Sequence, residues 1–141
     1  MSLVMLALAV SLTANQTGRQ AFAGTWIATH GGTTFVRLEL RVLENGIEGT
    51  IGLGNIHVDR TGVVDEVTGA PGNLKPIFDV TLKDSTLSFA SKDEHDTDRF
   101  EVVLTGADAE IRFVFSDLDR QALAAEGVPV PKPIRLTKLG R

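Results

Sequence analysis

The side chains best suited to chemistry in this sequence are three histidines, His30, His57 and His95, and a run of carboxylates around the last of them. Residues 93–98 read DEHDTD, which places four acids beside His95. Carboxylate oxygens are good ligands for a divalent cation, but the run lacks the sixth-position glycine and the trailing glutamate of an EF-hand loop. Aspartates also stabilise tight turns by bonding nearby backbone amides, so we interpret the run as a hairpin tip and predict no metal site.

A second candidate is the pair His57 and Asp59, which would project from the same face of one strand. Such a pair suits metal binding or acid–base chemistry, but no third partner is identifiable, and polar alternation on an exposed strand explains it more simply. The chain has no cysteine and no serine in a Gly-x-Ser-x-Gly elbow, and GLGN at residues 52–55 is too short to cradle a phosphate. We therefore predict no catalytic residue and no cofactor, with a metal-dependent hydrolase as a distant alternative.

The charge balance argues against nucleic acid as a partner. The 141 residues include 14 Lys and Arg against 18 Asp and Glu, for a formal net charge of −4, and there is no basic run. Proteins bind a phosphate backbone through clustered cations, and this sequence has no such cluster. The lack of cysteine also excludes disulfides and thiolate metal sites.

The N-terminus carries an export-like pattern. Residues 3–10, LVMLALAV, form an apolar run that is followed by the small-residue stretch SLTA. This is typical of a secretory signal, although no Lys or Arg precedes it, and a core-packed N-terminal helix is the alternative. The run is too short to span a bilayer as a helix, so we expect no transmembrane span. We expect residues 1–21 to be a signal peptide or N-terminal segment, residues 22–141 to be the folded domain, and the protein to be secreted or periplasmic.

The middle of the sequence alternates between strands and turns. Asn45-Gly46 predicts a type I′ turn, which needs a positive φ at both residues. That turn would place Leu40 opposite Ile51, with Leu38 on the same face. Directly opposed residues share a face of the sheet, so this hairpin would have one apolar side and one charged side.

Three further turns predict a meander whose large residues share one face. A two-residue turn at residues 84–85 would place Val80 opposite Phe89. A four-residue loop at residues 93–96 would place Phe89 opposite Phe100, and a turn at residues 107–108 would place Phe100 opposite Phe115. A shift of one position would move a whole strand's side chains to the other face, so the agreement among these turns supports the pairing.

The face occupied by Trp26 depends on the loop after its strand. A two-residue turn at Gly31-Gly32 would place Trp26 opposite Arg37 on the wet face, whereas a three-residue loop would move it to the apolar face near Val36 or Leu38. Fully burying an aromatic side chain favours folding by ~1.5–3 kcal/mol. We therefore predict an odd-length loop and an inward Trp26.

The spacing of the apolar residues changes after the meander from strand alternation to a helical pattern. Residues 117–125 read as a short helix with Ser116 as its N-cap, and a last strand near residues 134–139 should pair with the first. About nine or ten short strands are too many to lie flat in so small a chain. The predicted fold class is all-β, a single antiparallel up-and-down β-barrel of about 8–10 strands with one short helix before the last strand, because closure removes the sheet edges.

The opening Gly24-Thr25-Trp26, followed by a glycine turn and by EGT at residues 48–50, resembles the start of calycin barrels. Lipocalins share the Gly-x-Trp, and avidins share a similar GTW segment. The resemblance covers about a fifth of the chain and implies a ligand-holding barrel; its lipocalin form also implies a late arginine over the tryptophan, which Arg112 or Arg135 would supply. With a single Trp and no Tyr, avidin-like biotin binding is not implied. The GTW and DTDRF segments also resemble uncharacterised bacterial secreted domains.

Two functions fit such a barrel. The first is a non-enzymatic, calycin-like protein that binds a small hydrophobic ligand. The second is a filled barrel acting as a protein-interaction or accessory domain in the bacterial cell envelope, with a homodimer as one form. Small barrels either fill their interior with side chains or hold one ligand. Asp98 and Ser91 would be polar groups at the rim. The residues expected to line the interior are Trp26, Leu38, Leu40, Phe78, Phe89, Phe100, Phe113 and Phe115.

Overall fold

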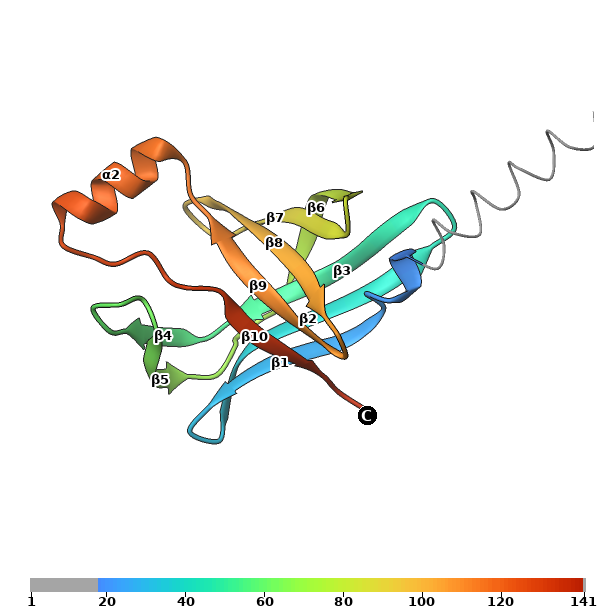
Figure 1. The fold of residues 1–141 in the computed structure, drawn as a ribbon, viewed down its shortest axis with the longest axis horizontal. Coiled ribbons are helices and arrows are strands. Elements are labelled where there is room, and N and C mark those ends of the chain that lie inside the picture. Colours follow the sequence, from blue (N-terminus) through green and yellow to red (C-terminus); the bar gives the residue numbers. More distant parts are fainter. Residues whose placement is uncertain (1–17, 141) are drawn as a thin grey trace, which may run out of the picture.

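The computed structural model describes residues 18–140, so residues 1–17 of the N-terminal segment expected over residues 1–21 lie outside the described residues (Figure 1). Among these residues no helix has the length and apolar character needed to cross a membrane. The elements of the described chain are β1 (Gly24–His30), β2 (Thr33–Leu43), β3 (Gly46–Leu53), β4 (Asn55–Val58), β5 (Val64–Gly69), β6 (Lys75–Lys83), β7 (Thr86–Lys92), β8 (Thr97–Thr105), β9 (Asp108–Val114), α2 (Asp117–Ala125) and β10 (Ile134–Lys138).

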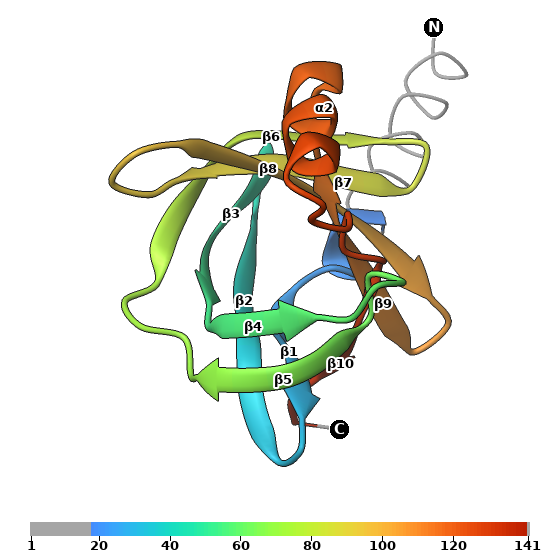
Figure 2. The ribbon, with the colours of Figure 1, turned by 90° about the vertical axis from the view of Figure 1, so that its left-hand side faces the viewer.

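Eight of these strands close into an antiparallel barrel in the order β1-β10-β9-β8-β7-β6-β3-β2, which confirms the predicted fold class. The strands β4 and β5 form a separate two-stranded sheet between β3 and β6. This hairpin and α2 lie at one end of the barrel, here named the far end (Figures 1 and 2). The described N-terminal residues lie at the opposite end, here named the near end, together with the turns β2–β3, β6–β7 and β8–β9.

The barrel closes where the last strand meets the first. Trp26 in β1 pairs with Lys138 in β10, and the Leu139 amide donates to the Thr25 carbonyl at 2.8 Å. Both ends of the folded chain are thus tied into the same wall.

The helix before β10 is capped as predicted, because the Ser116 hydroxyl oxygen accepts a hydrogen bond from the Asp119 amide at 3.1 Å.

Two predicted turns lie one residue later in the sequence than the turns of the structure. The β2–β3 turn centres on residues 44–45, so Leu40 faces Gly49 and Leu38 faces Ile51. Neither Asn45 nor Gly46 has a positive φ, so the predicted type I′ turn is wrong. The β8–β9 turn likewise centres on residues 106–107, and Phe100 faces Phe113 instead of Phe115. In both hairpins the pairing moves by two residues, which preserves every side chain's face.

Trp26 lies on the apolar face, as predicted, but for a different reason. Gly31 and Gly32 both have positive φ and form a two-residue turn, so the predicted odd-length loop is wrong. The extra residue is instead Phe35, at a β-bulge opposite Ala28 and Thr29. This bulge sets Trp26 opposite Leu38 and also turns Phe35 inward, where it is 3% exposed.

A second bulge overturns the predicted position of Phe78. The register shifts between Phe78 and Thr81, and Asp79 there has a φ of 52°. Beyond the bulge, Phe78 pairs with Ala90 and Ile77 pairs with Ser91, so Val80 does not oppose Phe89 as expected. The slip of one residue exchanges the two faces of the strand: Ile77 becomes buried and Phe78 becomes 39% exposed.

Gly49 fits the β2–β3 pairing because it allows a close backbone approach. A Cβ at position 49 would lie 2.0 Å from the Glu39 carbonyl oxygen, so Gly49→Ala forces two strands apart. We expect this variant to lose about 1–3 kcal/mol of unfolding free energy, the range for overpacked positions. Urea unfolding measures the loss.

Gly46→Ala in the same strand is the matched control, because a Cβ there meets nothing within 4 Å and its φ is not positive. We expect little change in its unfolding free energy. Equal losses for the two variants would contradict the close approach at Gly49.

Candidate functional site

The middle of the barrel is packed with side chains. Phe89 and Phe100, both 1% exposed, stack with ring centroids 5.5 Å apart. Phe100 also contacts Phe113, with centroids 5.4 Å apart. Close-packed rings of this kind stabilise the core by excluding water and by favourable ring geometry. The other expected interior residues with at most 5% exposure are Trp26, Leu38 and Leu40.

Three of the expected interior phenylalanines lie elsewhere or only partly inside. Phe113 and Phe115 are half-buried at the end of β9, with ring centroids 6.1 Å apart. They line a pocket of about 290 Å³ with Ala122 and Leu123 of α2 and with Glu126, the residue that caps the helix C-terminus. Phe78 lies on the exposed face of β6. Helix α2 itself has no buried residue, so it borders this pocket without packing into the barrel.

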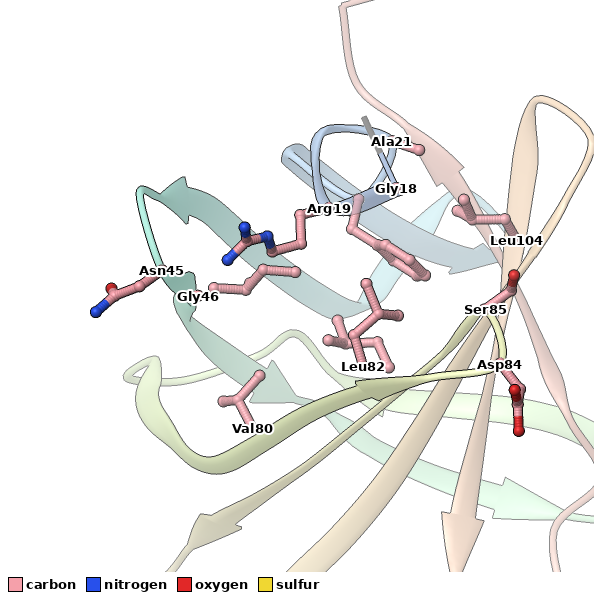
Figure 3. Close-up of a pocket in the computed structure, with 13 residues that line it drawn as sticks. Gly18, Arg19, Ala21, Asn45, Gly46, Val80, Leu82, Asp84, Ser85 and Leu104 are labelled. Carbon is pink, nitrogen blue, oxygen red and sulfur yellow. The ribbon is translucent and has the colours of Figure 1, made fainter. Parts of the chain in front are cut away.

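The near end carries a pocket of about 600 Å³ that the sequence did not predict (Figure 3). Its walls come from the described N-terminal residues, the β2–β3 turn and the β6–β7 hairpin, with Leu104 of β8 completing them. Polar and apolar atoms contribute about equally to its surface. The apolar lining residues are Ala21, Phe22, Ile47, Val80, Leu82, Leu87 and Leu104, and the polar rim residues are Arg19, Asn45, Asp84 and Ser85.

The N-terminal wall of this pocket is held by backbone and indole hydrogen bonds. The Phe22 amide donates to the Arg19 carbonyl at 3.0 Å, and the Ala23 amide donates to the Gln20 carbonyl at 3.1 Å. The Trp26 Nε1 then donates to the Phe22 carbonyl oxygen at 2.9 Å. Because Phe22 is 1% exposed, this short turn is anchored to the core and can present Arg19 at a fixed place.

Arg19 contributes a buried donor without an acceptor. Its Nε atom is buried, and it has no hydrogen-bond partner among residues 18–140. Four other arginines each form an ion pair with a carboxylate: Arg37 with Glu39, Arg41 with Glu48, Arg99 with Asp79, and Arg135 with Asp108. The near-end pocket therefore combines an apolar lining with one guanidinium that no described carboxylate neutralises.

The predicted polar rim lies at the far end. Asp98 pairs with Ser91 across β7 and β8, and Ser91 is 6% exposed. Burial raises the pKa of the Asp98 carboxyl, and the nearby Asp93 and Asp96 carboxylates raise it further. Asp93 instead accepts from the His95 and Asp96 amides, at 2.8 and 2.7 Å, which lowers its pKa and confirms that the acidic run is a turn.

The histidine pair predicted from the sequence is different in the structure. Nδ1 of His57 lies 2.6 Å from Oδ1 of Asp65 on the neighbouring strand, and this hydrogen bond raises the pKa of His57. Asp59 instead accepts from Thr61 and the Val63 amide within its own turn, which lowers its pKa. His30 reaches the Asp65 carbonyl at 3.1 Å. Residues 18–140 hold no group of three or more His, Asp or Glu placed to bind a metal.

A lysine covers the tryptophan where the lipocalin resemblance implied an arginine. Nζ of Lys138 lies 5.5 Å from the centroid of the Trp26 ring, a cation–π arrangement. Arg135 bonds Asp108 instead, and Arg112 is exposed and opposite Glu101. Neither arginine therefore takes the implied place.

The near-end residues escaped sequence reasoning because they come from distant parts of the chain. Arg19 and Phe22 precede the first strand, and the only local signal is a cation and an aromatic residue three apart directly before Gly24. Val80 lies at the register shift in β6, between Phe78 and Thr81. His57 pairs with Glu66, and Asp65 is the extra residue at a register shift between His57 and Val58, so the turn at residues 59–62 did not predict their contact.

The Asp98→Asn variant tests whether ionisation of this carboxyl is unfavourable in the folded protein. A raised pKa means that the ionised carboxyl is less favourable in the folded state. The stabilising effect of the protonated Asp98 carboxyl is therefore fully present below the usual pKa of 3.8, and it is lost as the pH rises through the folded pKa. We expect Asp98→Asn to raise the unfolding midpoint at pH 7 by roughly 1–3 °C, since solvent screens this half-exposed group.

The gain from Asp98→Asn should vanish at about pH 3, where both folded and unfolded carboxyls are protonated. Glu94→Gln removes an exposed acid of the same loop and should raise the midpoint less. Thermal melts followed by circular dichroism measure all three proteins. A lower midpoint for Asp98→Asn at pH 7 would contradict the assignment.

The His57–Asp65 contact predicts a pH-dependent link. Because the folded pKa of His57 lies above 6.5, the contact stabilises the protein below pH 6.5, and the effect is lost as the pH rises through the folded pKa. We expect Asp65→Asn to move the His57 titration midpoint in NMR down toward 6.5. Glu66→Gln, a more distant carboxylate, should move it less; an unchanged midpoint in Asp65→Asn would disprove the contact.

Comparison of this chain with protein-family models, with curated proteins and with solved structures found no match. The closed eight-stranded antiparallel barrel is compatible with the calycin architecture that its opening segment resembles. What the protein binds must therefore be argued from the geometry of the barrel and its two ends.

Proposed function

We propose that this protein binds a small hydrophobic molecule in the near-end pocket, without catalysis. The observation that carries the proposal is the apolar hollow of about 600 Å³ bounded by Phe22, Val80, Leu82 and Leu104 at the open end of a closed barrel. Pockets that hold small ligands are usually concave, mostly apolar and about 300–1,000 Å³ in volume, with a few polar groups that set orientation. The near-end pocket has the volume and the orienting polar groups of such a site, and seven apolar side chains form its inner wall, while polar and apolar atoms contribute about equally to its surface.

The packed interior supports an end site over a central one. Leu38 and Val102 are each 0% exposed and fill the middle of the barrel between the two ends. A ligand there would have to displace several close-packed side chains, each of which contributes to folding. At the near end, Val80, Leu82 and Leu104 are only partly buried, so a ligand could cover apolar surface that water now contacts.

A filled barrel that acts as an interaction or accessory domain is the second candidate. The packed core favours it, and so do exposed apolar residues near the far end, Val63, Leu118, Val128 and Val130. A secreted or periplasmic location fits either function and remains part of the proposal. The two candidates differ in one respect: only the first requires occupancy of the near-end pocket.

Titration with a neutral hydrophobic fluorophore, N-phenyl-1-naphthylamine, followed by displacement with 1-decanol, tests the proposal. We expect saturable binding by the wild-type chain. Val80→Asp places a carboxylate in the apolar lining, and we expect the affinity for both molecules to fall by about tenfold or more. Circular dichroism checks that the variant is folded, and Leu82→Gln provides a second change in the same lining.

Val63→Asp is the matched control, because Val63 is 46% exposed and lies in the β4–β5 turn at the far end. We expect its affinity to equal that of the wild type. No saturable binding by the wild type, or equal losses in Val80→Asp and Val63→Asp, would reject the near-end site in favour of the filled-barrel function.

A further inference from the structure

We infer that the near-end pocket selects an amphipathic anion: an apolar chain that enters the lining, with a carboxylate or similar oxyanion head that pairs with Arg19. This inference rests on the proposed function and adds the chemical class of the ligand. It depends on three features of the pocket, which are the unsatisfied donor, its fixed position and the surrounding charge.

The first feature is the unsatisfied donor. The Nε atom of Arg19 is buried and lacks an acceptor within residues 18–140. Burying a donor without an acceptor is unfavourable, and native proteins seldom leave one in this state. A guanidinium is permanently charged and presents several donors in a planar fork that matches a carboxylate or phosphate. An oxyanion head group would satisfy this donor.

The second feature is the fixed position of Arg19. The helical turn that carries it is tied to the barrel through Phe22 and Trp26. Figure 3 shows the Arg19 side chain extending toward the β2–β3 turn at Asn45 and Gly46, above the level of Val80 and Leu82. A ligand with its head at Arg19 would therefore direct its chain toward the apolar lining of β6.

The third feature is the local charge. The chain has a formal net charge of −4, so an anion is disfavoured over most of its surface. The acid that lines the same pocket, Asp84, lies on the opposite rim from Arg19, and Figure 3 shows its side chain pointing away from Arg19. The anion-binding part of the pocket is thus confined to the Arg19 side, which gives the ligand one orientation.

Calorimetric titration at pH 8 with decanoate and with 1-decanol separates the head group from the chain. We expect the wild-type chain to bind decanoate roughly tenfold more tightly than 1-decanol, the difference expected for a hydrogen bond to a charged group. Arg19→Gln should remove this preference, because it should weaken the binding of decanoate far more than the binding of 1-decanol. Arg19→Lys, which keeps the charge but not the fork, should retain part of it.

Arg41→Gln is the matched control, since it removes the same charge from an exposed arginine that is paired with Glu48 outside the pocket. It should keep the wild-type preference for decanoate. Equal wild-type affinities for decanoate and 1-decanol, or equal effects of Arg19→Gln and Arg41→Gln, would overturn the anion inference while the hydrophobic site stands. Failure of both molecules to bind would instead reject the proposed function, and this inference with it.

Discussion

The burial of the Trp26 indole is the interaction on which the rest of the barrel depends. The ring is 2% exposed, faces Leu38, donates to the Phe22 carbonyl and lies beneath the Lys138 ammonium. These contacts join β1 to β2, to β10 and to the N-terminal turn. An apolar ring with one hydrogen-bond donor suits this place, since its body excludes water while its N–H is satisfied. Closure of the barrel and formation of the near-end wall therefore share one side chain.

Two bulges decide which large side chains the barrel can bury. In β2 the extra residue is Phe35, and it brings both Phe35 and Trp26 inside. In β6 the irregularity at Asp79 reverses the faces of two residues, so Ile77 is buried and Phe78 is exposed. Bulges bend and twist a strand locally, which a small closed barrel requires of its walls. The same local distortion that closes the sheet thus sets the composition of the core and leaves Val80 at the pocket.

The contrast between a packed middle and a hollow end limits where the barrel can act. A ligand in the centre would compete with Phe89 and Phe100, whose rings already stack. At the near end, by contrast, two hairpin turns, Leu104 of β8 and the N-terminal turn meet without filling the space between them. The sequence of turns and termini can vary without disturbing the hydrogen bonds between the strands of the barrel. A binding site at this end therefore has little effect on the stability of the fold. The position of Arg19 there combines charge recognition with an apolar hollow.

Several features of this protein follow from its sequence by itself. Alternation along β2, β7 and β8 assigns Leu38, Leu40, Phe89 and Phe100 to the core, because side chains of a strand alternate with a period of two. Errors of one residue in two turn positions did no harm, since they move the cross-strand pairing by two residues and preserve that parity. The cap at Ser116 and the turn-forming role of the acidic run also depend only on neighbouring residues.

The tertiary structure decided what depends on distant segments. A bulge changes parity by one, and whether a strand bulges is set by its partner strands and by the curvature of the closed sheet, so the faces of Phe78 and Trp26 could not be derived from their own hairpins. The near-end pocket likewise exists only because residues as far apart as Arg19 and Leu104 come together when β1 pairs with β10. Local sequence specifies periodicity and turns, whereas a site built from separated segments requires the closed barrel.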